Sequence, residues 1–345
     1  MKPKKRKRML MLTDGNLDNA SARIRAIQYV PFFKKQGFKV SHIPRIPLKP
    51  STSIDKYFTF PLLKRCYNLK MILAILFGKW EIVYIQRFFV KEYLLKHLNK
   101  REIPIIYDFD DAIYINERCP DDRLAAINMI RSASKVIIST DYLQAFCVQN
   151  GKTAEVINTP VETDRIRPTV KSPEHLLTIG WIGSPWTSGF LEIVEKPLQR
   201  LAQKYTFCFL TIGAKPDYNI EGINHVARPW TFDNENKDLG NMDIGIMPLP
   251  DTDYAGMKGG YKLILYMSAG IACVASPVGI NQMIIEPGEN GFLASDAEEW
   301  YEKLEILIKD SAFRTQLGAT GRHHAIELYS REVCFKKLLH IIQEL

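Results

Sequence analysis

The chain has 345 residues, of which 46% are hydrophobic and 24% are charged. This composition predicts a soluble globular protein with one large or two medium domains. The longest apolar run, residues 71–78, is far shorter than the roughly 20 residues that span a bilayer, which excludes a membrane-spanning helix. Six single cysteines without a CxxC pair, and a basic start without the apolar core of a signal peptide, predict a cytoplasmic protein.

Charge is distributed unevenly along the chain. Residues 1–170 carry 30 Lys+Arg against 16 Asp+Glu, a net charge of +14, whereas residues 171–345 carry a net charge of −6. A basic half suits nucleic acid, an anionic membrane surface or phosphate groups. No helix-turn-helix, RNA-binding aromatic signature or zinc finger accompanies it, so we expect no nucleic-acid partner.

Short β-branched runs alternate with longer stretches of helical spacing in both halves. The strands predicted in the first half are residues 9–12, 81–86, 104–107, 135–139 and 154–157. Those in the second half are residues 176–182, 207–212, 223–226, 242–247 and 272–275. Such alternation is typical of βαβ units and parallel sheets. We therefore predict an α/β protein with two Rossmann-like domains facing each other across a cleft.

A proline-containing polar segment separates the two sets of strands. Residues 158–173 hold three prolines, which continue neither a helix nor a central strand. We predict an N-terminal domain over residues 1–160, a hinge over 161–174 and a C-terminal domain over 175–328. A C-terminal helix is predicted over residues 329–345. This helix either continues the C-terminal domain or packs back on the N-terminal domain.

Arginines follow the strands of the first half. Arg23 and Arg25 lie in the segment after the first strand, and Arg87 ends a later one. Guanidinium groups bind oxyanions in bidentate fashion, so these three residues are candidates for holding phosphate or an anionic acceptor. A helix-face or salt-bridge role with nearby aspartates is the equal alternative.

Three aspartates end the strand predicted at 104–107. Asp108, Asp110 and Asp111 can bind a metal, orient a hydroxyl group or cap the following helix. Each of these roles remains open on the sequence pattern.

The densest signal in the second half is a Pro- and Gly-rich loop, residues 248–260, after a strand. A helix is predicted to begin near Gly259–Lys262. Gly259 and Gly260 allow close approach, Lys258 and Lys262 supply charge, and helix N–H groups bind anions. The loop therefore predicts a diphosphate site, with a plain loop bearing solvated lysines as the alternative.

The segment from Lys262 to Gly279 resembles the nucleotide-sugar region of family 4 retaining glycosyltransferases, which has the form K-L-x-E-x-M-A-x-G-x-P-V-V-A-S-x-x-G. The matching positions are Lys262, Leu263, Met267, Gly270, Val274, Ala275, Ser276 and Gly279. The segments starting at Glu289 and Leu317 continue the resemblance. The first half of the chain resembles that family's acceptor domain, but less closely than the second half resembles the donor domain.

The resemblance implies a GT-B enzyme that moves a sugar from a nucleoside-diphosphate sugar to a glycan or lipid-linked acceptor, with retention, in surface polysaccharide or glycoconjugate synthesis. It implies no metal and no cofactor. The donor-binding residues that it implies are Gly183, Ser184, Asp251, Lys258, Gly259, Gly260, Tyr261 and Lys262. The catalytic residues that it implies are Asp110, Asp111 and Lys262. The two aspartates are implied by their position alone, because they stand at the strand end where related enzymes often carry a His-Asp pair.

The sequence departs from the family pattern at two places. Ser184 and either Thr187 or Ser188 stand where the family has Arg and Lys, and Met257 and Leu265 stand where it has two glutamates. Asp251 or Asp253 is a candidate replacement for one glutamate. A non-catalytic nucleotide-sugar or glycan-binding module is therefore the main alternative, and a nucleotide-sugar epimerase is a third.

Two further segments have two interpretations each. Residues 58–80 combine leucines with basic side chains, an amphipathic pattern suited to an anionic bilayer surface or to packing on the first sheet. Peripheral contact with the inner face of the membrane therefore stays open. Trp230 borders the nucleotide base or belongs to the core.

Overall fold

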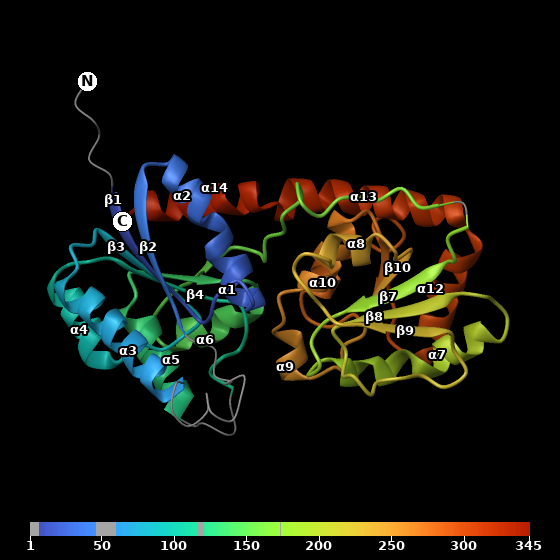
Figure 1. The fold of residues 1–345 in the computed structure, drawn as a ribbon, viewed down its shortest axis with the longest axis horizontal. Helices are drawn as coiled ribbons and strands as arrows, with labels where there is room; N and C mark the ends of the chain where they lie inside the picture. The colour runs from blue at the N-terminus through green and yellow to red at the C-terminus, as the bar shows by residue number, and fades with distance from the viewer. Residues whose placement is uncertain (1–6, 46–59, 116–120, 173) are drawn as a thin grey trace. The chain divides into compact units, whose positions relative to one another are not determined.

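The computed structural model describes residues 7–45, 60–115, 121–172 and 174–345 (Figure 1). The chain divides into two compact units: unit 1 is Met1–Thr159 with Cys334–Leu345, and unit 2 is Pro160–Val333. The predicted hinge, residues 161–174, falls within unit 2, and the last 12 residues belong to unit 1. Phe58, Thr59 and Cys119, and the basic start up to Arg6, lie outside the described residues.

Unit 1 contains a parallel sheet of six strands in the order β2-β1-β3-β4-β5-β6. The strands are β1 (Lys7–Thr13), β2 (Phe38–Pro44), β3 (Ile82–Gln86), β4 (Ile105–Phe109), β5 (Lys135–Ile138) and β6 (Glu155–Val156). The helices are α1 (Ala20–Arg25), α2 (Val30–Lys35), α3 (Phe60–Phe77), α4 (Glu92–Lys100), α5 (Asp121–Ser132), α6 (Gln144–Gln149) and, from the chain end, α14 (Arg331–Gln343).

Helices cover both faces of this sheet, which is why its central strands are buried throughout. Met9, Tyr84 and Ile106 on one face pack against Phe33 of α2 and Phe335 of α14. Helices α3, α4 and α5 lie side by side on the other face (Figure 1). Strands buried on both faces read as continuous apolar runs, as these do in the sequence.

Unit 2 contains a second parallel sheet in the order β12-β11-β10-β7-β8-β9. The strands are β7 (Thr178–Ile182), β8 (Cys208–Ile212), β9 (His225–Arg228), β10 (Ile244–Met247), β11 (Ala272–Ala275) and β12 (Phe292–Leu293). The helices are α7 (Glu192–Ala202), α8 (Glu235–Leu239), α9 (Asp253–Gly256), α10 (Tyr261–Ser268), α11 (Asn281–Ile284), α12 (Ala297–Lys309) and α13 (Ser311–Tyr329).

The core of unit 2 also has two layers. Helices α10 and α13 pack on one face of the sheet, and α7 and α12 pack on the other (Figure 1). Trp300 of α12 and Tyr266 of α10 are both fully buried. The predicted α/β class with two Rossmann-like units is confirmed.

Each of the ten predicted strands overlaps an observed one, but β2 and β12 were not predicted. Both are edge strands. In strand β2 only Phe38 and Ile43 are buried, while the four residues between them are exposed or half-buried, and β12 has only two residues. Neither strand has the continuous apolar run of several residues on which the prediction relied.

Candidate functional site

The strand order of unit 2 reverses between β7 and β10. The chain proceeds from β7 to β8 and β9 on one side and then returns to the other side of β7 with β10. Ligands of open parallel sheets bind beyond the carboxyl ends of the strands at such a reversal. The loops after β7 and β10 meet this condition, and they carry the predicted donor residues Gly183, Ser184, Asp251, Lys258, Gly259 and Gly260, with Tyr261 and Lys262 following.

A buried tyrosine holds the two strands and α10 together at the reversal. The pairing of β7 with β10 covers only Ile179–Ile244 and Gly180–Gly245. Beyond it, the Tyr266 hydroxyl accepts a hydrogen bond from Ile182 N (3.1 Å) and donates one to Ile246 O (3.1 Å). Burial raises the pKa of Tyr266, so the hydroxyl stays protonated. Helix α10 is therefore fixed to both strands that flank the reversal.

Helix α10 begins with a glycine that supplies no capping side chain. Gly260 is the N-cap, with φ of 66°, and makes no side-chain cap hydrogen bond. A Cβ atom at this position would lie 2.3 Å from Cδ1 of Ile284. The first N–H groups of a helix have no partner within the helix, and they attract anions. The start of α10 therefore suits an anionic ligand.

The structure brings Lys262 and Gly183 together. Lys262 Nζ lies 5.6 Å from the centroid of the Trp181 ring. A Cβ atom on Gly183 would lie 3.0 Å from Cε of Lys262 and 2.3 Å from Cζ2 of Trp181. A glycine after β7 thus leaves room for the lysine from α10, which places a cation at the reversal.

The other predicted donor residues lie on the same loops with contacts of their own. Lys258 Nζ lies 4.3 Å from the ring centroid of Tyr254. Ser184 is exposed, and its Oγ lies 3.3 Å from Oγ1 of Thr187, which closes the turn after β7. Asp251 is exposed in the loop after β10.

Gly213, which follows β8, was not predicted as a site residue. Gly213 has φ of 75°, and a Cβ there would lie 2.3 Å from Gly183 O and 3.2 Å from Cβ of Trp230. The loops after β7, β8 and β9 therefore meet at this glycine. Trp230 is half-buried, packs on the core and donates from Nε1 to Oε1 of Glu235 (2.9 Å). A glycine directly after an apolar strand was the available signal.

In unit 1 a polar network joins the ends of β3 and β4 to α1. Arg87 has a left-handed backbone conformation, with φ of 65°. Its guanidinium contacts both aspartates, with Nη2 3.1 Å from Oδ2 of Asp111 and Nη1 3.7 Å from Oδ1 of Asp110. Ser21 Oγ donates to Oδ1 of Asp110 (2.6 Å), and Gln86 Nε2 donates to Ser21 Oγ (2.7 Å). The two predicted catalytic aspartates and one predicted arginine are thus in contact.

Two expectations about this strand end need correction. Neither Asp110 nor Asp111 caps the following helix, because α5 begins at Asp121. The anion-clamp alternative for Arg25 is wrong, because its guanidinium is buried and donates to Asp108 Oδ1 (2.8 Å), Asp108 Oδ2 (3.0 Å) and Ile157 O (2.6 Å). The side chain holds β4 to the segment after β6.

Arg23 is also buried, and its Nη1 donates to Leu17 O (2.9 Å), which supports a structural role. Burial raises the pKa of Asp108, while hydrogen bonds from Arg25 and Tyr84 oppose this shift by stabilising the carboxylate. No group of three His, Cys, Asp or Glu side chains in the described part of the chain is arranged to hold a metal ion.

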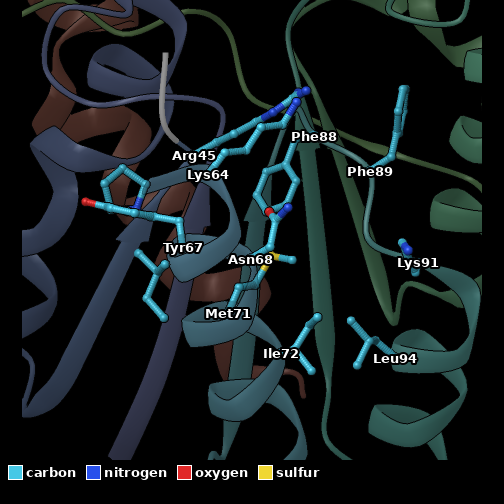
Figure 2. Close-up of a pocket in the computed structure, with 12 residues that line it drawn as sticks. Arg45, Lys64, Tyr67, Asn68, Met71, Ile72, Phe88, Phe89, Lys91 and Leu94 are labelled. Carbon is cyan, nitrogen blue, oxygen red and sulfur yellow. The ribbon is translucent and has the colours of Figure 1, made fainter. Parts of the chain in front are cut away.

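A cavity of about 290 Å³ in unit 1 was not predicted (Figure 2). It lies between the end of β2, helix α3 and the segment that follows Arg87. Its walls are mostly apolar, with three cations among them. The lining residues are Ile43, Pro44, Arg45, Lys64, Tyr67, Asn68, Met71, Ile72, Phe88, Phe89, Lys91 and Leu94.

Part of the chain matches a known protein family. Residues 173–310 match the family described as Glycosyl transferases group 1. No curated protein has a matching sequence.

Three solved structures share the fold over nearly the whole chain. Sucrose-phosphate synthase from Thermosynechococcus elongatus is 14% identical with a TM-score of 0.73, over 98% of this chain and 99% of that one. Anabaena HepE, solved with UDP and glucose, is 15% identical with a TM-score of 0.70, over 98% and 100%. A putative UDP-N-acetylglucosamine 2-epimerase from Listeria monocytogenes is 9% identical with a TM-score of 0.62, over 98% and 96%.

The chain thus has the two-domain GT-B fold, and residues 173–310 of unit 2 are similar to the group 1 glycosyl transferases. Within the described ranges, none of the helices combines the length and apolar character that crossing a membrane requires.

Proposed function

We propose that the protein transfers a sugar from a nucleoside-diphosphate sugar to a glycan or lipid-linked acceptor, with retention at the anomeric carbon, in surface polysaccharide or glycoconjugate synthesis. The observation that carries the proposal is the meeting of Gly183 and Lys262 at the reversal between β7 and β10. A cation, a close backbone approach and an uncapped helix start together suit a diphosphate.

The chemistry follows from the charge that develops as the sugar leaves. Negative charge grows on the diphosphate, and a fixed ammonium group and N–H dipoles stabilise it without reorganisation. In this proposal Lys262 and the start of α10 supply that stabilisation, Lys258 adds charge on the same loop, and no metal ion or cofactor takes part.

For unit 1 we propose that Asp110 or Asp111 orients the acceptor hydroxyl. Arg87 contacts both carboxylates, and Ser21 donates to Asp110, so the network holds the carboxylates in fixed positions. Arg87 has the further proposed role of binding an anionic acceptor group, because it is only partly buried. The cavity that borders this segment is the candidate place for the rest of the acceptor.

Replacing Lys262 tests the donor assignment. Because the ammonium stabilises negative charge that develops on the diphosphate in the transition state, we expect Lys262→Ala to lower turnover by about 10²- to 10³-fold. Release of nucleoside diphosphate from a panel of UDP-, GDP- and ADP-sugars measures this loss. Lys237→Ala, which changes an exposed lysine of α8, is the matched control, and circular dichroism checks the fold. Equal turnover of the two variants would refute the phosphate assignment.

One observation favours a non-catalytic sugar-nucleotide-binding module as the second candidate. The turn after β7 has Ser184 and Thr187 where the resembling family has Arg and Lys, and Leu265 is buried where that family has an acid. Calorimetric binding of UDP without turnover of any sugar in the panel would support the module. Conversion of the donor without an acceptor would instead indicate an epimerase.

A further inference from the structure

Helix α3 of unit 1 exposes an apolar stripe. Leu62, Cys66, Leu69, Leu73 and Phe77 are all exposed, and Phe77 is 75% accessible. Their spacing of three and four residues places them on one face of the helix. The stripe therefore runs along most of the 18 residues of α3.

The opposite side of α3 is apolar as well. Ile75 is fully buried against unit 1, and Met71 and Ile72 are half-buried and line the cavity (Figure 2). Apolar side chains thus lie on two sides of α3, with exposed basic side chains between them. One apolar side of the helix already packs on unit 1, so the exposed stripe on the other side indicates a second contact surface.

The charge around the stripe identifies what covers it. Residues 60–101 contain nine Lys+Arg and two Asp+Glu, a net charge of +7, and α3 itself has no acidic residue. Arg65 and Lys70 are exposed and flank the stripe. A second copy of the chain on this face would bring like charges together, whereas anionic lipid headgroups complement them.

We propose that the outward face of α3 docks on an anionic lipid bilayer. The helix lies in the plane of the interface, its leucines and Phe77 enter the acyl boundary, and Arg65 and Lys70 reach the headgroup phosphates. Apolar area and charge then act together, as stable peripheral binding requires. Docking of α3 on a bilayer is a separate property from the proposed glycosyl transfer and does not depend on it.

Cys66 provides a direct probe because it lies on the stripe and is exposed. Cys147, Cys273 and Cys334 are buried, so a Cys119→Ser, Cys208→Ser background directs an environment-sensitive fluorophore to Cys66. We expect a blue shift of its emission on vesicles of phosphatidylcholine with phosphatidylglycerol, and none on phosphatidylcholine alone. As a reference, the dye on Ile326→Cys, in the same background with Cys66→Ser, keeps its aqueous emission on either vesicle.

A matched pair of variants tests the stripe without a label. Leu73 and Ile326 are 45% and 43% accessible, on α3 of unit 1 and α13 of unit 2. We expect Leu73→Asp to weaken flotation with anionic vesicles at least about tenfold, since a leucine leaves the acyl boundary and a charge enters it. Ile326→Asp is expected to bind like the unchanged chain, and both substitutions are at exposed positions where folding tolerates charge.

The proposal fails if the unchanged chain does not float with anionic vesicles or if Leu73→Asp floats as well as Ile326→Asp. It also fails if sedimentation shows a dimer that Leu73→Asp dissociates, because a second copy would then cover the stripe. Donor turnover of Leu73→Asp with a soluble acceptor is expected to equal that of the unchanged chain. Loss of vesicle binding with normal turnover therefore separates this proposal from the proposed function.

Discussion

At the start of α10, both the backbone conformation and the available space require a glycine at position 260. Its φ of 66° is unfavourable for residues with a Cβ, and a Cβ would lie 2.3 Å from the side chain of Ile284. Both requirements act on the backbone that faces the predicted diphosphate. A change at this residue should thus affect stability and ligand binding together.

We predict that Gly260→Ala costs about 2–3 kcal/mol of the free energy of unfolding, because it adds overpacking to the cost of the left-handed conformation. Gly222→Ala is the control, since Gly222 has φ of 78° and a Cβ there would meet no atom within 4 Å. Urea denaturation measures both, and we expect about 1 kcal/mol for Gly222→Ala. Equal costs would show that Ile284 moves aside.

Arg25 and Arg87 show how burial decides the role of one residue type. Arg25 has its guanidinium bound inside unit 1 by Asp108 and Ile157, whereas Arg87 is partly exposed against Asp110 and Asp111. Both arginines follow a strand in the sequence. Only the one that keeps solvent access can serve the acceptor, which is why the proposal retains Arg87 and not Arg25.

Among the elements, α10 is the one that ties the candidate site to the sheet. It begins at the reversal and contributes Tyr266, whose hydroxyl bridges Ile182 N and Ile246 O. The helix start is thus positioned by a bond to each flanking strand. Loss of this bridge should loosen the site without removing any ligand-binding group.

We predict that Tyr266→Phe destabilises unit 2 by about 1–3 kcal/mol, because a buried N–H and a buried carbonyl both lose their partner. Thermal denaturation measures the change. Tyr205→Phe, which removes a partly exposed hydroxyl bonded to Glu305, is the reference and should cost less than about 1 kcal/mol. An unchanged melting temperature for Tyr266→Phe would mean that water replaces the hydroxyl.

Within unit 2 as a whole, Asp243 links the segment before β7 to the start of β10. It accepts hydrogen bonds from Lys171 Nζ (2.6 Å) and Thr178 N (2.7 Å), and its Oδ2 lies 2.8 Å from His175 Nε2. Burial raises the pKa of Asp243, but these partners together outweigh burial and lower it. Burial lowers the pKa of Lys171, which is nonetheless protonated at acid pH in both the folded and the unfolded chain.

Because the folded-state pKa of Asp243 is depressed, its stabilising contribution is full above the unfolded value of roughly 3.9 and is lost as the pH falls through the folded value. We predict that Asp243→Asn lowers the melting temperature at neutral pH and that this difference shrinks towards pH ~3. Asp217→Asn changes an exposed carboxylate and serves as the control. A difference that does not vary with pH would contradict the linkage.

Local patterns in the chain were enough to predict the α/β class and ten of the strands. Apolar runs, their alternation with helical spacing, and prolines that interrupt both depend on neighbours along the chain, so they can be read without a structure. The loop from Lys258 to Lys262 was predicted for the same reason, because glycine, lysine and a helix start lie within five residues.

The tertiary structure decided what depends on residues far apart in the chain. Arg25 meets Asp108 83 positions away, and Tyr266 meets Ile182 84 positions away. Spacing in the sequence records neither pair. The reversal between β7 and β10, the cavity beside α3 and the outward direction of its apolar stripe likewise follow from how the elements pack, because burial is a property of the folded surface rather than of the residue type.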